Sequence, residues 1–254
     1  MTITILPDVT VLFLLLFARL GALVMLMPGT GEQPIPVNAR LGIALTLSLV
    51  FYPTVAGTLP QGLANDLTRL VVAMIGEILI GIAIGLIARI MMSVTQIAGT
   101  NIASQIGLGF AMSVDPTMGQ QGAIVAGFLS VTAMVLIFAA DIHHIAIAAI
   151  ADSYTMFPPG SPPPIGDFAD VAVTTVGEAF KIGIEISAPF IVFGLVFNFG
   201  LGVLAKLMPQ LQVFFLAMPV SIGVGLILFA FLVTTMMGLY ASHLEDGLMR
   251  FIGP

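Results

Sequence analysis

The sequence predicts an all-α, polytopic membrane protein of helical hairpins, formed by one domain over residues 1–254 and lacking a soluble domain. Three observations lead to this prediction. Hydrophobic residues make up 59% of the chain, charged residues only 8%, and the mean hydropathy is +1.15. A soluble domain carries about 25% charged residues, so this chain has too few to cover a surface that faces water. Membrane lipid or other apolar protein must surround most of it.

A helix that spans a bilayer needs about 20 predominantly apolar residues. Residues 1–8 contain no Lys or Arg and no cleavage site follows, so we expect the first apolar stretch to stay in the mature protein. The fifth stretch is too long for one simple span, and Pro189 within it predicts a break or kink. The sequence therefore predicts six or seven apolar spans. The stretches cover residues 9–28, 40–59, 71–95, 123–150, 171–205 and 211–240.

The connections between these stretches are polar or rich in glycine and proline. Residues 157–166 read FPPGSPPPIG, which predicts a polyproline-II segment. The connection over 151–170 carries three aspartates and no Lys or Arg. The positive-inside rule therefore favours a position for it away from the cytoplasm.

Several classes of function lack the residues they need. The chain has net charge −6 and seven scattered Lys and Arg residues, which excludes the basic surface of a nucleic-acid-binding protein. It has no cysteine, so disulfides and thiolate metal sites are impossible. It also has no phosphate-binding loop, no His-Glu-x-x-His and no nucleophile elbow. We expect no catalytic residues, no cofactor and no metal ion.

Charged residues within the apolar stretches are the first candidates for a site, because ionisable groups in lipid usually face protein or water. Glu77, Gly81, Gly85 and Arg89 follow one another at four-residue steps, which predicts a common helix face. The two glycines allow another helix to approach closely. We interpret this face as a helix–helix contact; an ion path along it is the alternative. Arg19 also lies in the middle of an apolar stretch.

Two further polar groups have structural and functional interpretations. Residues Glu178, Lys181 and Glu185 can form a ladder on one face, as a salt bridge or, alternatively, a proton relay. Asp141 and His144 can share a face, with His143 pointing elsewhere. A contact between helices is the favoured interpretation of this second group, and proton sensing is the alternative.

The segment over 99–121 combines glycines with large apolar side chains. Glycine gives the backbone freedom, whereas the apolar side chains favour burial. Irregular backbone is tolerated at membrane depth where protein or a water-filled cavity surrounds it. A plain connecting loop and a loop packed into a pore both remain open from these residues alone.

Short motifs spread over most of the chain resemble one family. They include Phe17–Arg19, the segment over 28–36 and the segment over 76–81. Further along come Gln105–Gly107, followed by Val114 with Asp115 and Pro116, then Asp141–His144 and residues 204–214. Pro209 and Gln210 with Phe214 form the most specific part. Together these motifs resemble the FliR family of flagellar export-gate proteins, related to the SctT family of virulence secretion systems.

The resemblance implies a structural subunit of the flagellar type III export gate in the bacterial inner membrane, at the flagellar basal body. It implies FliP-like and FliQ-like partners and an FlhB-like protein, which together export unfolded flagellar subunits through a channel. It also implies that one loop plugs this channel. That loop consists of Gly107, Leu108, Gly109, Phe110, Ala111 and Met112.

Alternatives to this function remain. The chain can be the SctT-type subunit of a virulence system, or a scaffold without a role in the pore. Membrane-embedded charges and an interrupted fifth stretch also fit a secondary transporter.

Overall fold

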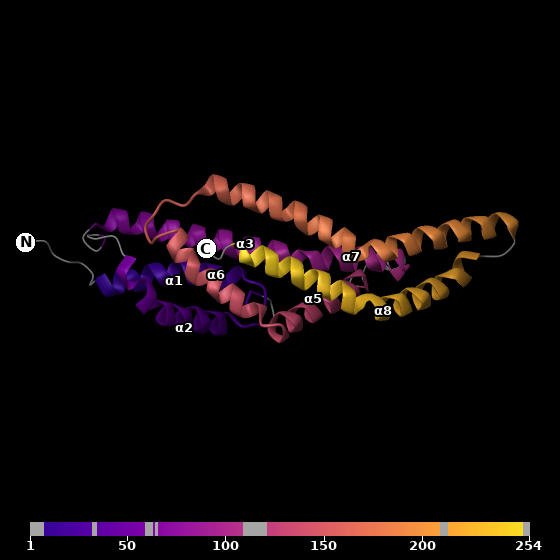
Figure 1. Ribbon diagram of the computed structural model, residues 1–254, viewed down its shortest axis with the longest axis horizontal. Coiled ribbons are helices and arrows are strands. Elements are labelled where there is room, and N and C mark those ends of the chain that lie inside the picture. Colours follow the sequence, from indigo (N-terminus) through magenta and orange to yellow (C-terminus); the bar gives the residue numbers. More distant parts are fainter. Residues whose placement is uncertain are drawn as a thin grey trace, which may run out of the picture. The chain divides into compact units, whose positions relative to one another are not determined.

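The protein is described by a computed structural model over residues 8–31, 35–58, 63, 66–108, 121–208 and 213–250. Within these residues all regular elements are helices, which confirms the predicted all-α class (Figure 1). In chain order they are α1 (Asp8–Leu26), α2 (Val37–Val55), the short 3-10 helix η1 (Ala56–Thr58), α3 (Leu67–Gln105), α5 (Gln121–Ala139), α6 (Ile142–Met156), α7 (Ile165–Leu207) and α8 (Val213–Met249).

Four of these helices are long and apolar enough to cross a membrane: α1, α3, α7 and α8. Helices α5 and α6, bent by 76° at the break between them, form either a fifth, broken span or a re-entrant loop. Helix α2 has 19 residues but includes Asn38, Arg40 and Pro53, which lower its hydropathy. By length and composition, the described helices are those of a membrane protein.

The fourth apolar stretch is divided, which the sequence did not predict. Helix α5 ends at Ala139, and Asp141 has a backbone φ of +58° before α6 begins at Ile142. This left-handed conformation costs most residues about 1–2 kcal/mol, and aspartate is among the residues that adopt it as single turns. Since a left-handed residue cannot continue a right-handed helix, the hydrogen-bond ladder stops there.

The fifth apolar stretch is not divided. The sequence predicted a break or a kink at Pro189, and the break is wrong. Helix α7 continues through Pro189 from Ile165 to Leu207. A proline removes one backbone donor and costs a helix roughly 3 kcal/mol. Ending the helix in apolar surroundings would instead leave several backbone groups unpaired at each new end, which is worse than the loss of one hydrogen bond.

The chain forms two compact units. The first unit consists of Met1–Met91, Ile142–Val176 and Asp246–Pro254, and the second of Met92–Asp141 and Gly177–Glu245. Residues of α3, α7 and α8 fall in both units.

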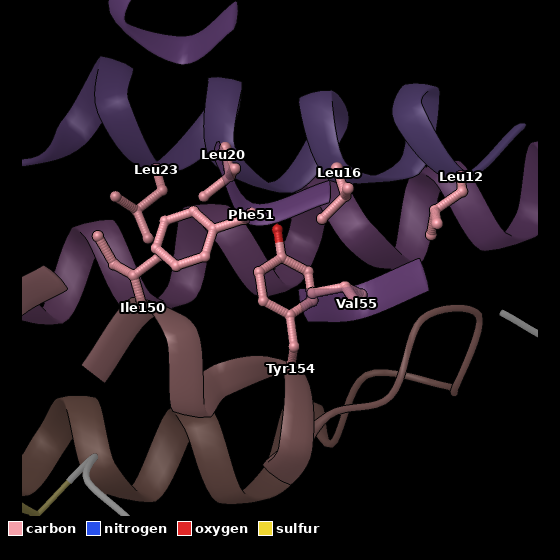
Figure 2. Close-up of a cluster of buried hydrophobic side chains, with 8 residues drawn as sticks. All are labelled: Leu12, Leu16, Leu20, Leu23, Phe51, Val55, Ile150 and Tyr154. Atoms are coloured by element: carbon pink, nitrogen blue, oxygen red, sulfur yellow. The ribbon is translucent and has the colours of Figure 1, made fainter. Parts of the chain in front are cut away.

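The first unit has a core built on one face of α1 (Figure 2). Leucines recur along this helix at three- and four-residue intervals, which is the spacing of a single helix face. They face apolar side chains of α2 and α6 (Figure 2). The buried cluster consists of Leu12, Leu16, Leu20, Leu23, Phe51, Val55, Ile150 and Tyr154.

Much of the apolar surface elsewhere is uncovered. Only 11% of the most apolar 18-residue stretch of α7 is buried, compared with 50% for that of α1. Phe199 of α7 and Phe231 of α8 are 77% and 80% exposed. Exposed apolar side chains of this extent mark sites of contact with membrane lipid or other protein.

Candidate functional site

Arg19 is the largest fully buried side chain of the described residues, although it carries a charge. Its position on α1 lies between the buried leucines Leu16 and Leu20. A charged group in such surroundings is costly unless it is paired and hydrogen-bonded. The folding of α1 into the core of the first unit therefore depends on what the guanidinium contacts.

Glu77 of α3 provides the opposite charge. The Arg19 Nε donates to Glu77 Oε2 at 2.6 Å, and the two side chains are 0% and 1% exposed. The remaining guanidinium nitrogens bind α6 and the residues after it. Nη1 donates to the Ser153 carbonyl oxygen at 2.9 Å, and Nη2 donates to that of Phe157 at 2.6 Å. The Tyr154 ring lies 4.2 Å from Arg19 Cζ, within the range of a cation–π interaction.

We call these residues the Arg19 cluster: Arg19, Glu77, Ser153, Tyr154, Phe157 and Gly160. The Ser153 carbonyl oxygen, near the end of α6, also accepts a hydrogen bond from the Phe157 backbone N–H at 3.0 Å, so Arg19 adds a second bond to it. The second carboxylate oxygen of Glu77 accepts from the backbone N–H of Gly160 at 3.1 Å. Gly160 has a φ of +81°, which glycine adopts at little energetic cost. The cluster thus fixes the connection from α6 to α7 onto α1 and α3.

Gly81 and Gly85 allow α1 and α3 to approach closely beside this cluster. A Cβ atom on Gly81 would overlap the Arg19 carbonyl oxygen and lie 3.0 Å from Ala22 Cβ. A Cβ atom on Gly85 would lie 2.8 Å from Leu26 Cβ. The backbones therefore leave no room for a side chain at either position.

Arg89 does not join this contact, because its side chain is exposed. Each four-residue step along an α-helix advances about 40° beyond a full turn. Arg89 consequently lies roughly 120° around the helix from Glu77. The expected face of four residues thus places Glu77, Gly81 and Gly85 against other parts of the first unit and turns Arg89 outward.

The sequence did not connect Arg19 with Glu77. It marked Arg19 as a charge in the middle of one apolar stretch and grouped Glu77 with Gly81, Gly85 and Arg89 on a face of another. The rule that charged groups in apolar stretches pair with one another was the available signal. It did not identify the carbonyls of Ser153 and Phe157, because backbone acceptors leave no trace in the sequence.

The second location indicated by the sequence is the end of α3, in the second unit. Gly107 has a φ of +92°, and Leu108 is half-buried. The other four residues of the expected plug, Gly109 to Met112, lie outside the described residues, as do Asp115, Pro116, Pro209 and Gln210. Phe214 lies in the first turn of α8.

The two other polar groups that the sequence indicated lie on α7 and at the start of α6. Lys181 and Glu185 lie 3.9 Å apart (Nζ to Oε1) on α7, and both side chains are exposed. His143 and His144 occupy the first turn of α6 with ring centroids 4.1 Å apart. The prediction that His143 points away from His144 is therefore wrong, because helical spacing fixes the Cβ positions but not the rings, which lean together.

Comparison with known proteins relates the whole arrangement to bacterial export. Residues 10–247 match the family described as bacterial export proteins, family 1. The chain is 44% identical to the flagellar biosynthetic protein FliR of Caulobacter vibrioides over 216 residues. The aligned residues are 85% of this chain and 86% of the relative. It is 30% identical to the FliR protein of Bacillus subtilis over 219 residues, or 85% and 83% of the two chains.

A relative from a different system is more distant. The Yop proteins translocation protein T of Yersinia pestis is 25% identical over 245 residues, which are 95% of this chain and 92% of the relative. The resemblance seen in the short motifs thus extends over nearly the full length of the sequence. The chain belongs to the family of bacterial export proteins, family 1.

Proposed function

We propose that this chain is a structural subunit of the type III protein export gate of a bacterial flagellum. The observation that carries the proposal is the family match over residues 10–247, with 44% identity to a flagellar biosynthetic protein. The lower identity to a Yop translocation protein, 25%, favours a flagellar over a virulence system. The bacterial inner membrane at the flagellar basal body is the corresponding location.

The uncovered helices support a role inside an assembly. Leu195, Phe199 and Leu207 of α7 are 66%, 77% and 75% exposed. Interfaces of permanent complexes resemble a domain core cut in half, and the apolar side of α7 has this character. We propose FliP-like and FliQ-like subunits and an FlhB-like protein as the partners. Unfolded flagellar proteins are the cargo of the channel, and membrane lipid covers the remaining apolar surface.

The plug of this channel is proposed for Gly107–Met112, of which the structure describes Gly107 and Leu108. In support, the glycine at the end of α3 has a left-handed backbone, so the chain leaves the helix at the first residue of the proposed plug. Apolar side chains form no hydrogen bonds with water, so on such a turn they can fill the narrow part of a channel and exclude water from it.

A structural role also agrees with the chemistry of the Arg19 cluster. Its charged atoms form hydrogen bonds that join α1, α3 and the end of α6 with the segment that follows it. Arg19 and Glu77 are buried, so a solute cannot reach them. We therefore propose a subunit without catalytic activity, cofactor or metal ion.

Deletion of the gene and purification of a tagged chain test the proposal together. Deletion should abolish motility and the export of flagellar proteins, and the full-length gene should restore both. The tagged chain should copurify with two other small apolar membrane proteins. A secondary transporter would instead move a small solute when reconstituted alone in liposomes. Normal motility after deletion, or purification without companions, would reject the proposed function.

Deletion of the proposed plug distinguishes an export-gate subunit from a scaffold without a role in the pore. Deletion of Gly107–Met112 should let small solutes leak across the membrane while the complex still copurifies. Unchanged permeability with an intact complex would favour the scaffold.

A further inference from the structure

The end of α3 is held by both α7 and α8, within the second unit. One side of the last turns of α3 is buried: Ile102, and Ile106 directly after the helix, are both 0% exposed. A helix end has unpaired carbonyl groups and frays unless other groups bind them. The contacts of Gln105, Ile106 and Gly107 show how this end is fixed.

Ile106 is held by two residues of α8. Its carbonyl oxygen accepts a hydrogen bond from Ser221 Oγ at 3.1 Å. Its side chain occupies the space above Gly225, where an added Cβ atom would lie 2.6 Å from Ile106 Cβ. Ser221 and Gly225 are separated by four residues, about one helical turn, so they present these two contacts on one face of α8.

Gln105 is held by α7. A Cβ atom on Gly194 would overlap the Gln105 side-chain oxygen and lie 3.3 Å from its Cβ. Gly107 follows with its left-handed backbone, and a Cβ atom there would lie 3.8 Å from Ser221 Oγ. The last residues of α3 therefore fit against a surface of glycines and one hydroxyl group.

This fit is specific to a few positions. Gly223 on α8, and Gly200 and Gly202 on α7, have no described atom within 4 Å of an added Cβ. Glycine is frequent along both helices, but only Gly194 and Gly225 are occupied by residues from the end of α3. The neighbouring glycines thus provide matched controls.

We propose that Gly194, Ser221 and Gly225 are positioning residues that fix the end of α3 and so set where the chain leaves it at Gly107. We call these three residues the α3 anchor. The inference rests on the proposed function, in which the residues from Gly107 onward close the resting channel. A displaced helix end would move the start of the plug and loosen the closure, although the subunit would still assemble.

The main test compares Gly225→Val with Gly223→Val in cells that carry the full export gate. Gly225→Val should raise the leak of small solutes several-fold, with copurification of the complex unchanged. Gly223→Val adds the same side chain to the same helix, at a position with no described atom within 4 Å, and should leave the leak at the wild-type level. If Gly225→Val prevents assembly, Gly225→Ala and Ser221→Ala provide smaller changes to the same contact.

Exchanging the large and the small residue tests the contact between Ile106 and Gly225 directly. Ile106→Ala removes the side chain that lies above Gly225, so Ile106→Ala combined with Gly225→Val should leak less than either single variant. A general loss of stability would give the double variant the larger defect. That result would overturn the assignment.

The position of the helix end is measured independently of leak. Because the chain has no cysteine, spin labels on Ser104→Cys and Val220→Cys, both exposed positions, report one distance in the purified complex. Gly225→Val should shift or broaden this distance, and Gly223→Val should not. An unchanged distance would refute the anchor, and a shifted distance with unchanged leak would refute its role in closure. Neither result depends on the motility test, which addresses the proposed function alone.

Discussion

Arg19 and Glu77 form an ion pair that water does not reach, although 58 positions separate them in the sequence. The same guanidinium binds carbonyl groups of residues 134 and 138 positions away. One side chain of α1 thereby joins α3, the end of α6 and the segment that follows it. The stability of the first unit should therefore depend on this single residue more than on any exposed charge.

Replacing Arg19 with alanine should strongly destabilise the first unit. The substitution leaves Glu77 buried without its counter-ion, and breaking a buried pair in this way costs about 3–5 kcal/mol. Thermal unfolding of the purified complex and the amount of the chain in membranes would both measure the loss.

Arg69→Ala is the matched control for this experiment. Arg69 Nε pairs with Asp66 Oδ2 at 3.3 Å, but the side chains are 77% and 45% exposed. Pairs of this kind contribute about 0–1 kcal/mol, so the control should resemble the wild type. Equal effects of both substitutions would contradict the importance given to burial.

Gly81→Ala should force α1 and α3 apart. The new methyl group would overlap the backbone of Arg19, and overpacking of this kind costs roughly 1–3 kcal/mol. Gly76→Ala on the same helix adds the same methyl group, whose nearest atom would be the Ser161 carbonyl oxygen at 3.5 Å, an ordinary contact. Unfolding temperatures should fall for Gly81→Ala only, and a similar fall for Gly76→Ala would point to a general effect of losing glycine.

Gly160→Ala should weaken the connection from α6 to α7. Its φ of +81° costs a residue with a side chain about 1–2 kcal/mol, and the strain also acts on the hydrogen bond from Gly160 N–H to Glu77. Limited proteolysis of the purified complex would detect faster cleavage between residues 157 and 164. Gly166→Ala, where nothing lies within 4 Å of the new Cβ, should be cleaved at the wild-type rate.

Tyr154→Phe should leave stability unchanged or slightly higher. The hydroxyl group is buried and makes no hydrogen bond within the described part of the chain. Leaving such a group unsatisfied costs about 1–3 kcal/mol, whereas the phenyl ring of phenylalanine keeps the contact with the Arg19 guanidinium. A fall in the unfolding temperature would show that the hydroxyl has a partner that matters.

The fold class followed from the sequence because composition and apolar length determine it almost directly. The position of the interruption did not. Proline is the strongest local signal for a helix break, yet α7 continues through Pro189 and the fourth stretch breaks at Asp141 instead. At Pro189 the penalty for unpaired backbone groups in apolar surroundings outweighs the local preference of proline, and this penalty is a property of the folded environment.

The Arg19 cluster was only partly accessible from the sequence for a related reason. Helical spacing relates residues within one turn of each other, so it grouped Glu77 with Gly81, Gly85 and Arg89. The actual partner of Glu77 belongs to a different helix. Four-residue spacing also grouped Arg89 with this face, although an advance of about 40° per step adds up to roughly 120° over three steps.

The Arg19 cluster has a consequence for the order of events during synthesis. A ribosome delivers Arg19 long before Ser153 and Phe157 exist, and Glu77 emerges between them. The guanidinium must therefore remain hydrated, or pair with Glu77 alone, until α6 has been made. Contacts between such distant residues close late and slow the acquisition of structure. The Arg19 cluster is complete only after more than half of the polypeptide has left the ribosome.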